Sequence, residues 1–412
     1  MNLMKKILVV ISTMAFTLNI TYSQGGSNYS IFGFGDIDVN PTSSYDGLAG
    51  TSIAFPLPHS INPINPAVLS KSEKTRLLSG YRFNQHLIED NKSNILFQNN
   101  GQISSLSTLF VIDTSKGITA TFGFNPYTSV KYLVRVPIDF SFEDMEITGR
   151  TDYQGQGGIT MAYLGGSAIV LSNLSVGALA FATFGIINSS ITTSLYESHA
   201  YTTTNKINNK FNGYGFRFGA LYEPKDNLFL GAYIEKHSKL EFEEEITYGA
   251  DLISDSTFTQ NNEIFLPGSF GFGASYLLGK FRFGGDYKIY NLKDMDFNKG
   301  PNTEYRNMQV ISIAVSRLGN TSINAQYLDK ITYNFGLGYK ELYYKINGVD
   351  INEIYGSFGL NLPLTESAII DASFTLGRRG SSDDKLVQEL FGRLTIDISI
   401  GETWFKPFKR EY

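Results

Sequence analysis

One ten-residue stretch, Phe281–Tyr290, alternates strictly between two kinds of residue. In an extended chain, successive side chains point to opposite faces. One face then carries mostly aromatic residues and the other carries the charges: Phe281, Phe283, Gly285, Tyr287 and Ile289 against Arg282, Gly284, Asp286, Lys288 and Tyr290. A strand with one apolar face and one charged face is typical of a transmembrane β-barrel, whose wall meets lipid outside and water inside.

Other stretches repeat the pattern, most clearly residues 214–222, 332–339 and 393–400. In the last of these, Arg393 and Asp397 point away from the face that carries Leu394, Ile396 and Ile398. We predict an all-β fold, a closed antiparallel barrel of about fourteen strands, an even number as such barrels require. The strands should begin near residues 75, 101, 117, 150, 174, 205, 228, 262, 280, 305, 330, 352, 367 and 389. A soluble β-sandwich is the alternative, but it needs about half as many strands.

The composition agrees with a barrel and excludes several other classes. Hydrophobic residues make up 42% of the 412 residues, too few for a helical membrane protein, whereas a barrel needs lipid-facing residues only at alternate positions. The net charge of −5 gives no reason to expect nucleic acid as a partner. The chain has no cysteine, which excludes disulfides, thiolate metal sites, a cysteine nucleophile and a lipid-anchored N-terminal cysteine.

The first residues have the pattern of an export signal. Lys5 and Lys6 precede a mostly apolar run, Ile7–Ile20, and Thr21-Tyr22-Ser23 is an acceptable cleavage site. We therefore predict a signal peptide over residues 1–23, and an N-terminal anchor helix is the alternative. No later run approaches the roughly 18 apolar residues of a membrane-spanning helix.

Residues 24–74 differ from the rest of the mature chain, because they hold five prolines and alternate weakly. Proline cannot donate to a strand ladder, so this segment should not form wall. Asn65-Pro66-Ala67 has the pattern of a helix start, with Asn65 as N-cap and Pro66 at the first helical position. We predict that residues 24–74 form a hatch inside the barrel of residues 75–412. A periplasmic tail is the alternative.

The connections also fit a barrel. Short turns are expected at residues 223–227, 278–280 and 347–348, and longer polar stretches, Leu240–Asn262 and Leu292–Tyr305, are expected to be extracellular loops. Glu241 and Glu243–Glu245 fall in the first of these loops. A solvated acidic loop is the simple interpretation, and a site that binds calcium or bridges lipopolysaccharide is the alternative.

Several segments together resemble the FadL-type long-chain fatty-acid transporters of the outer membrane. In the N-terminal region these are Tyr29–Asp36, Leu48–Ala54 and Asn65–Ala67, and in the wall they are Tyr214–Tyr222, Leu266–Tyr276 and Asp286–Lys288. The resemblance implies a fourteen-stranded barrel closed by an N-terminal hatch, with Asn65, Pro66 and Ala67 in the hatch motif. It also implies transport of hydrophobic molecules, with movement of the hatch and lateral exit through a gap in the wall.

Asn125-Pro126 interrupts the predicted strand Ile118–Val134. Proline removes a ladder hydrogen bond and bends the strand, so this position is a candidate lateral opening, and a simple turn or strand end is the alternative. Five charged residues should line the lumen, because placing an arginine against lipid at the bilayer midplane costs roughly 2–4 kcal/mol. They are Arg217, Arg282, Asp286, Arg393 and Asp397, which pair with one another or meet water, or else guide the charged head of a ligand.

Nothing in the sequence resembles an enzyme. The four histidines lie outside any nucleophile or metal-binding signature, and we predict neither a catalytic site nor a cofactor. The chain should lie in the outer membrane of a diderm bacterium, in contact with lipids, and should carry a hydrophobic small molecule such as a fatty acid. Because the long loops are polar, with no large apolar cluster to capture such a ligand, a second function is open. In that alternative, the barrel transports nothing and acts as a docking or accessory subunit of an outer-membrane secretion or assembly complex.

Overall fold

The computed structural model describes residues 25–404, apart from residues 41, 90–94, 143–144, 197–200, 252, 267, 323 and 382–385. The predicted signal peptide, residues 1–23, lies outside the described residues. Among the described residues, no helix is both long and apolar enough to span a membrane.

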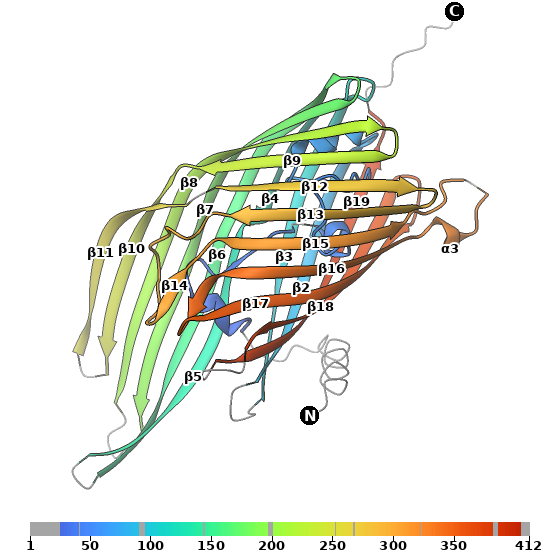
Figure 1. The fold of residues 1–412 in the computed structure, drawn as a ribbon. Helices are drawn as coiled ribbons and strands as arrows, with labels where there is room; N and C mark the ends of the chain where they lie inside the picture. Colours follow the sequence, from blue (N-terminus) through green and yellow to red (C-terminus); the bar gives the residue numbers. More distant parts are fainter. Residues whose placement is uncertain are drawn as a thin grey trace, which may run out of the picture.

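The wall consists of long antiparallel strands (Figure 1), in chain order. They are β2 Thr75–Glu89, β3 Ile95–Asp113, β4 Ile118–Pro126, β5 Thr128–Phe142, β6 Met145–Leu171, β7 Leu174–Leu195, β8 Thr202–Lys225, β9 Leu228–His237, β10 Lys239–Ala250, β11 Ile253–Phe265, β12 Ser269–Leu278, β13 Phe281–Tyr290, β14 Thr303–Tyr305, β15 Met308–Arg317, β16 Thr332–Ile346, β17 Val349–Pro363, β18 Ala368–Gly380 and β19 Gln388–Glu402.

These strands run from one end of the barrel to the other fourteen times, which confirms the predicted fourteen-stranded barrel. Three crossings are interrupted, so that β4 continues as β5, β9 as β10 and β11 as β12, and the three-residue β14 only precedes β15. The ring closes where β19 pairs with β2, from Glu402 opposite Thr75 to Gln388 opposite Glu89. Alternation sets the two faces: Phe283 is 47% exposed on the outside, whereas its neighbour Arg282 reaches into the lumen to the carbonyl of Pro56.

The barrel is taller on one side than on the other. β2 begins and β19 ends at one end, where turns such as Gly279 and Asp226–Asn227 are short, and short turns mark the periplasmic end. At the opposite, extracellular end, β5 to β8 and the hairpin of β10 and β11 reach beyond the other strands (Figure 1). One prediction is wrong here: Leu240–Asn262 is not a loop but forms most of the hairpin of β10 and β11 on this tall wall.

The second predicted loop, Leu292–Tyr305, is irregular up to the short β14, but it folds inward instead of remaining in solvent. Its Leu292, Met295 and Phe297 are buried among residues at the extracellular mouth of the lumen.

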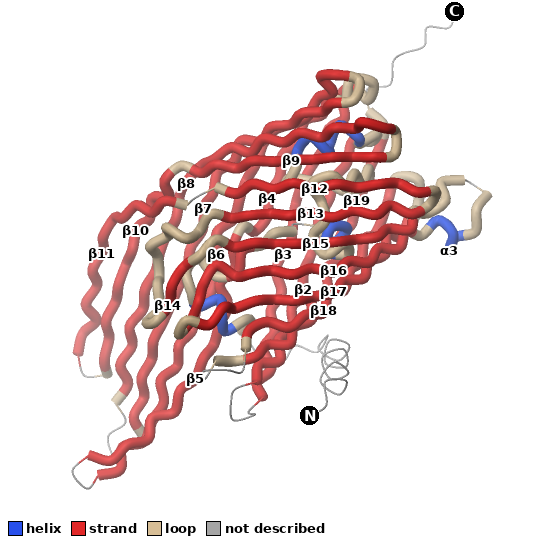
Figure 2. The backbone as a smooth tube through the Cα atoms, in the orientation of Figure 1, coloured by secondary structure: helices blue, strands red, loops and turns tan. Residues whose placement is uncertain are grey.

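Residues 25–74 run through the inside of the ring. They form only short elements, namely η1 Asn28–Ile31, β1 Asp36–Ile37, α2 Ser43–Asp46 and η2 Pro66–Lys71, and short helices are visible inside the ring of strands in Figure 2. Leu48, Ile53, Ala54 and Phe55 are almost completely buried there. The many prolines explain why this part of the chain adds no strand to the wall, apart from the two-residue pairing of β1 with β5.

Candidate functional site

The start of η2 packs against the wall at two positions, Gly177 and Gly219, where a larger residue would not fit. As predicted, the side chain of Asn65 caps this helix, accepting from the backbone N–H of Ala67 at 3.1 Å, with Pro66 next in the chain. The amide of Asn65 also donates to the carbonyls of Ile53 and Ala220. A Cβ at Gly177 of β7 would lie 2.4 Å from the carbonyl carbon of Pro66, and one at Gly219 of β8 would lie 2.0 Å from Oδ1 of Asn65.

Two buried arginines of the wall hold the first part of the segment. Arg82 of β2 contacts the carboxylates of Asp38 and Asp46 and the carbonyl of Asn40. Arg379 of β18 bonds Asp36 at 2.7 Å, and also Ser27 and the wall residue Glu353. Neither arginine was among the predicted lumen charges. Arg82 has the same signal in the sequence as those residues, a charge on the polar face of an alternating strand between Tyr81 and Phe83, whereas Arg379 stands between Arg378 and Gly380, where the alternation ends.

The predicted lumen charges point inward and contact the same segment. The guanidinium of Arg217 lies between Glu235 and the carbonyl of Pro63, and that of Arg282 bonds the carbonyl of Pro56. The carboxylate of Asp286 accepts from the backbone N–H groups of Ser52 and Ile53, at 2.6 and 2.9 Å. Next to it, Lys288 donates to the carbonyl of Gly50 at 2.6 Å.

On β19, Asp397 and Arg393 differ in how firmly they are held. Asp397 is buried and accepts from the backbone N–H of Ser43 at 2.5 Å. Arg393 is partly exposed, bonds Asn84 and lies 3.9 Å from Asp46. The inward charges thus bond mainly to backbone and carboxylates of residues 25–74, which compensates for their burial.

At the extracellular mouth the lumen is filled with aromatic side chains. Phe34 stacks on Phe297 with ring centroids 4.8 Å apart and meets Phe211 of β8 edge-on. Tyr343 and Tyr344 of β16 extend the same buried cluster, and Tyr344 stacks on Tyr29 of η1. This cluster joins residues 25–74, the wall and the inward-folded stretch 291–302 into one apolar core.

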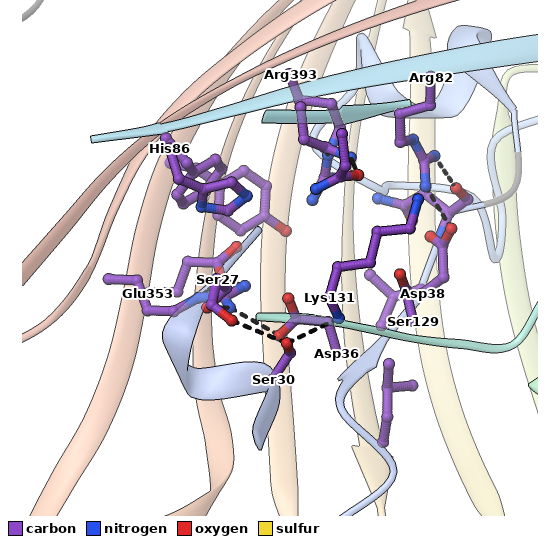
Figure 3. Close-up of a pocket in the computed structure, with 18 of the residues that line it drawn as sticks. Ser27, Ser30, Asp36, Asp38, Arg82, His86, Ser129, Lys131, Glu353 and Arg393 are labelled. Atoms are coloured by element: carbon purple, nitrogen blue, oxygen red, sulfur yellow. Dashed lines mark hydrogen bonds and ion pairs between the residues drawn. The ribbon is translucent and has the colours of Figure 1, made fainter. Parts of the chain in front are cut away.

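Beneath that cluster lies a cavity of about 60 Å³. Figure 3 shows charged side chains converging on it, among them Arg82, Lys131, Asp36, Asp38 and Arg393. The volume is less than half of the roughly 150 Å³ that a dry cavity needs to hold benzene, and the lining is polar, so the space suits one or two waters.

The same cavity adjoins an interruption in the wall. From Leu106 onward β3 pairs with β4, but its first part, residues 95–105, pairs only with β2. The strand breaks after Asn125 and Pro126, and β5 then pairs with β6 and with β1 instead of with β3. Asn125 and Pro126 still pair with β6, so the predicted interruption lies directly after them.

Side chains and the N-terminal segment bridge this space, which we name the β3–β5 gap. Ser129 Oγ donates to Gln102 Oε1 at 3.3 Å, and Lys131 Nζ donates to the carbonyl of Gly101 at 3.1 Å. The N–H of Gly25 donates to the carbonyl of Asn99, and Ser30 accepts from the N–H of Lys131.

The acidic stretch that was predicted as a loop, with a calcium or lipopolysaccharide site as the alternative, lies on β10. Within the described ranges, no group of three or more His, Asp or Glu residues is placed to hold a metal ion. Glu241, Glu243 and Glu245 lie on one face of β10, where Glu243 is paired with Lys210, and Glu244 lies on the other face.

Comparison with protein families gives one match, to the model described as BamG, over residues 3–411. The chain belongs to the BamG family. No curated protein matches this BamG-family chain.

Solved structures with the same fold are outer-membrane channels. The toluene transporter TodX of P. putida is 14% identical with a TM-score of 0.58, over 88% of this chain and 98% of that one. The toluene transporter TbuX of Ralstonia pickettii is 14% identical with a TM-score of 0.59, over 87% and 98%. A FadL homologue of Pseudomonas aeruginosa is 12% identical with a TM-score of 0.59, over 88% and 98%. The BamG-family chain therefore has the FadL-type fold and is an outer-membrane β-barrel.

Proposed function

We propose that this chain is a FadL-like barrel that works as a docking or accessory subunit of an outer-membrane secretion or assembly complex, and that it catalyses no reaction. The filled lumen carries the proposal. A transporter of hydrophobic molecules needs an apolar space between hatch and wall. Here the extracellular mouth is packed with aromatic residues around Phe34 and Phe297, and the cavity beneath measures about 60 Å³ and is lined by charges.

The attachment of residues 25–74 supports the same conclusion. Movement of this segment would have to separate Arg82 from Asp38 and Asp46, and Arg379 from Asp36, inside the barrel. Breaking one buried ion pair costs about 3–5 kcal/mol when one partner is left uncompensated. A segment bonded at several such points is suited to be a fixed part of the barrel, one that keeps the wall rigid while outer surfaces bind partners.

A disulfide that locks the segment tests this directly, because the chain has no cysteine of its own. Thr51 Oγ1 and Ser312 Oγ on β15 are 3.0 Å apart, so Thr51→Cys with Ser312→Cys joins segment and wall. Thr119→Cys with Ser167→Cys is the matched control, since those hydroxyls are 2.7 Å apart within the wall.

Cells that carry either disulfide should keep the function of the wild-type protein, and the tagged barrel, solubilised from native membranes, should retain a stoichiometric outer-membrane partner. Uptake of radiolabelled toluene or oleate should not depend on the chain. The proposal is overturned if wild-type protein supports such uptake and only the Thr51–Ser312 disulfide abolishes it, with recovery on reduction.

Transport of a hydrophobic molecule, with movement of the hatch and lateral exit, is the second candidate. The β3–β5 gap favours it, since the gap follows Pro126 and, among the described residues, side chains and residues 25–30 bridge it in place of a backbone ladder. Its test is a thiol crosslink between cysteines at Gln102 and Ser129, which closes the gap. Uptake that this crosslink blocks would favour transport, and uptake that it leaves unchanged would remove lateral exit.

A further inference from the structure

The hairpin of β10 and β11 ends the tall wall in a strand with a free edge. β10 pairs with β8 on one side and with β11 on the other. β11 pairs with β10 alone among the described strands, because β13, the partner of β12, ends at Tyr290 opposite Ser269. Alternate residues of Ile253–Phe265 therefore direct their backbone N–H and C=O groups away from the sheet. Figure 1 shows this hairpin projecting from the side of the barrel.

The edge has few of the features by which proteins protect exposed strands: a register shift between Tyr248 and Ala250, near the tip of the hairpin, and the charges of Asp255 and Glu263. Such edges are usually short, bulged, covered, or interrupted by proline or lysine. β11 has thirteen residues, neither proline nor lysine, and a continuous register with β10 from Phe265 to Ser256. Nearly all its residues are exposed, and Phe258, 62% exposed, contacts Tyr248 of β10 on the inner face of the tall wall. A second strand added here would find both backbone partners and an aromatic contact.

Charge indicates what kind of strand fits. Residues 239–265 contain seven acidic residues and one lysine, although the whole chain carries only −5. On the outer face, Glu243 pairs with Lys210 and Glu263 pairs with Lys239. Among the described residues, Glu241, Glu245 and Asp255 on that face form no ion pair, and Lys206, opposite Thr247, is the further lysine on this face, so carboxylates remain in excess. These carboxylates also place the hairpin outside the bilayer, since lipid would exclude them.

We propose that the free edge of β11 binds an extended, lysine- or arginine-rich segment of a partner protein, which adds a strand to the sheet outside the cell. The backbone groups of β11 hold the segment, and the outer carboxylates select its charge. This inference rests on the proposed docking function and names the surface and the chemistry of the partner.

A designed peptide tests the edge without knowledge of the partner. The probe is a short fluorescent peptide that alternates lysine and valine, titrated into the full-length barrel in detergent micelles and followed by anisotropy. We expect it to bind at least about tenfold more tightly than a peptide with glutamate in place of lysine. The same lysine peptide with several consecutive N-methylated residues keeps its charge but loses its hydrogen-bond donors, and should bind about tenfold more weakly. Equal binding of the N-methylated peptide would overturn strand addition.

A charge-reversed barrel locates the binding surface. Glu241→Lys, Glu245→Lys and Asp255→Lys together should abolish binding of the lysine peptide. The matched control changes three exposed acidic residues outside the hairpin by the same charge, with Asp294→Lys, Asp296→Lys and Glu304→Lys, and should bind like the wild type. Equal loss in both variants would overturn the assignment to β11, since it would reflect net charge alone.

The native partner separates this inference from the docking function. If wild-type barrel retains a stoichiometric partner and the charge-reversed hairpin loses it, while the control variant keeps it, both are supported. If the reversed hairpin keeps the partner, the β11 site is wrong and the docking function stands. If the wild-type barrel itself retains no partner, the docking function fails first.

Discussion

Gln98 of β3 donates from its side-chain amide to the backbone carbonyl of Leu133 on β5, 2.8 Å away, where no backbone ladder joins the two strands. At this point a side-chain hydrogen bond thus joins two strands that elsewhere in the wall would be joined by main-chain hydrogen bonds. The bond spans the β3–β5 gap, and the same amide reaches Asn28 of η1 at 3.3 Å. Closure of the wall at this point therefore depends on side chains, each of which can be substituted without disrupting the backbone pairing of a strand.

Gln98→Ala should open the gap locally while the barrel stays folded. The change leaves the partly buried carbonyl of Leu133 without this partner, which costs at most about 1–3 kcal/mol, the range for a fully buried group. We expect faster amide hydrogen exchange and easier proteolysis of residues 25–31. Gln154→Ala, at an exposed position of β6, is the control and should leave exchange unchanged. Identical exchange in the two variants would mean that the gap is held by other contacts.

Arg82→Ala should release the N-terminal segment more severely. The side chain is 3% exposed, and its removal takes away the ion-pair partner of Asp38 and leaves the buried Asp46 with only the longer contact to Arg393, at 3.9 Å. A loss of about 3–5 kcal/mol is expected for a buried pair broken in this way. The measurement is the temperature at which the folded band disappears in a heated, unboiled gel. Arg135→Ala is the control, because Arg135 is 62% exposed and 3.8 Å from Asp152, and exposed pairs contribute about 0–1 kcal/mol.

Gly177→Ala should displace η2. The added Cβ would lie 2.4 Å from the carbonyl carbon of Pro66, a backbone atom that cannot move without the helix, so the Asn65 cap and its bond to Ala220 should be strained together. Overpacking of this kind costs about 1–3 kcal/mol. Gly356→Ala is the control, since its Cβ would point outward with the nearest atom, on Leu337, at 3.4 Å. Equal unfolding temperatures for the two variants would contradict the close fit.

The wall was predictable because alternation is a local property of the chain. Phe281–Tyr290 shows both its faces without knowledge of any neighbour, and lipid imposes the same rule on every strand. The cap at Asn65 and Pro66 was predictable for the same reason, since it depends on adjacent residues. The polar stretch Leu240–Asn262 was wrongly predicted to be a loop, because strands that extend beyond the bilayer no longer need an apolar face.

The partners of the lumen charges were not predictable. Arg217 meets Glu235 on the next strand, which register specifies, but it also meets Pro63, more than 150 residues away. Such contacts depend on the path of residues 25–74 through the barrel, and that path follows from shape and not from a repeating pattern. The proline at 126 marks a break in the strand from the sequence alone, and a lateral opening there stays a prediction, whereas the bridging of the β3–β5 gap by Gln98 and Lys131 required the structure.

The stability of the barrel should fall in mild acid through His59. This imidazole lies in the N-terminal segment, 3.7 Å from Asp371 of β18, and its backbone carbonyl accepts from Ser399. Burial lowers the pKa of His59 below its ordinary value of 6.5; Asp371 opposes that shift and Arg76 adds to it. The unfolded chain therefore takes up a proton first as the pH falls through about 6.5, and the free energy of unfolding decreases from there down to the folded-state pKa. His59→Gln should flatten this part of the profile of unfolding temperature against pH, while stability above pH 7 changes little. An equally steep loss in His59→Gln would assign the acid sensitivity to the buried carboxylates instead.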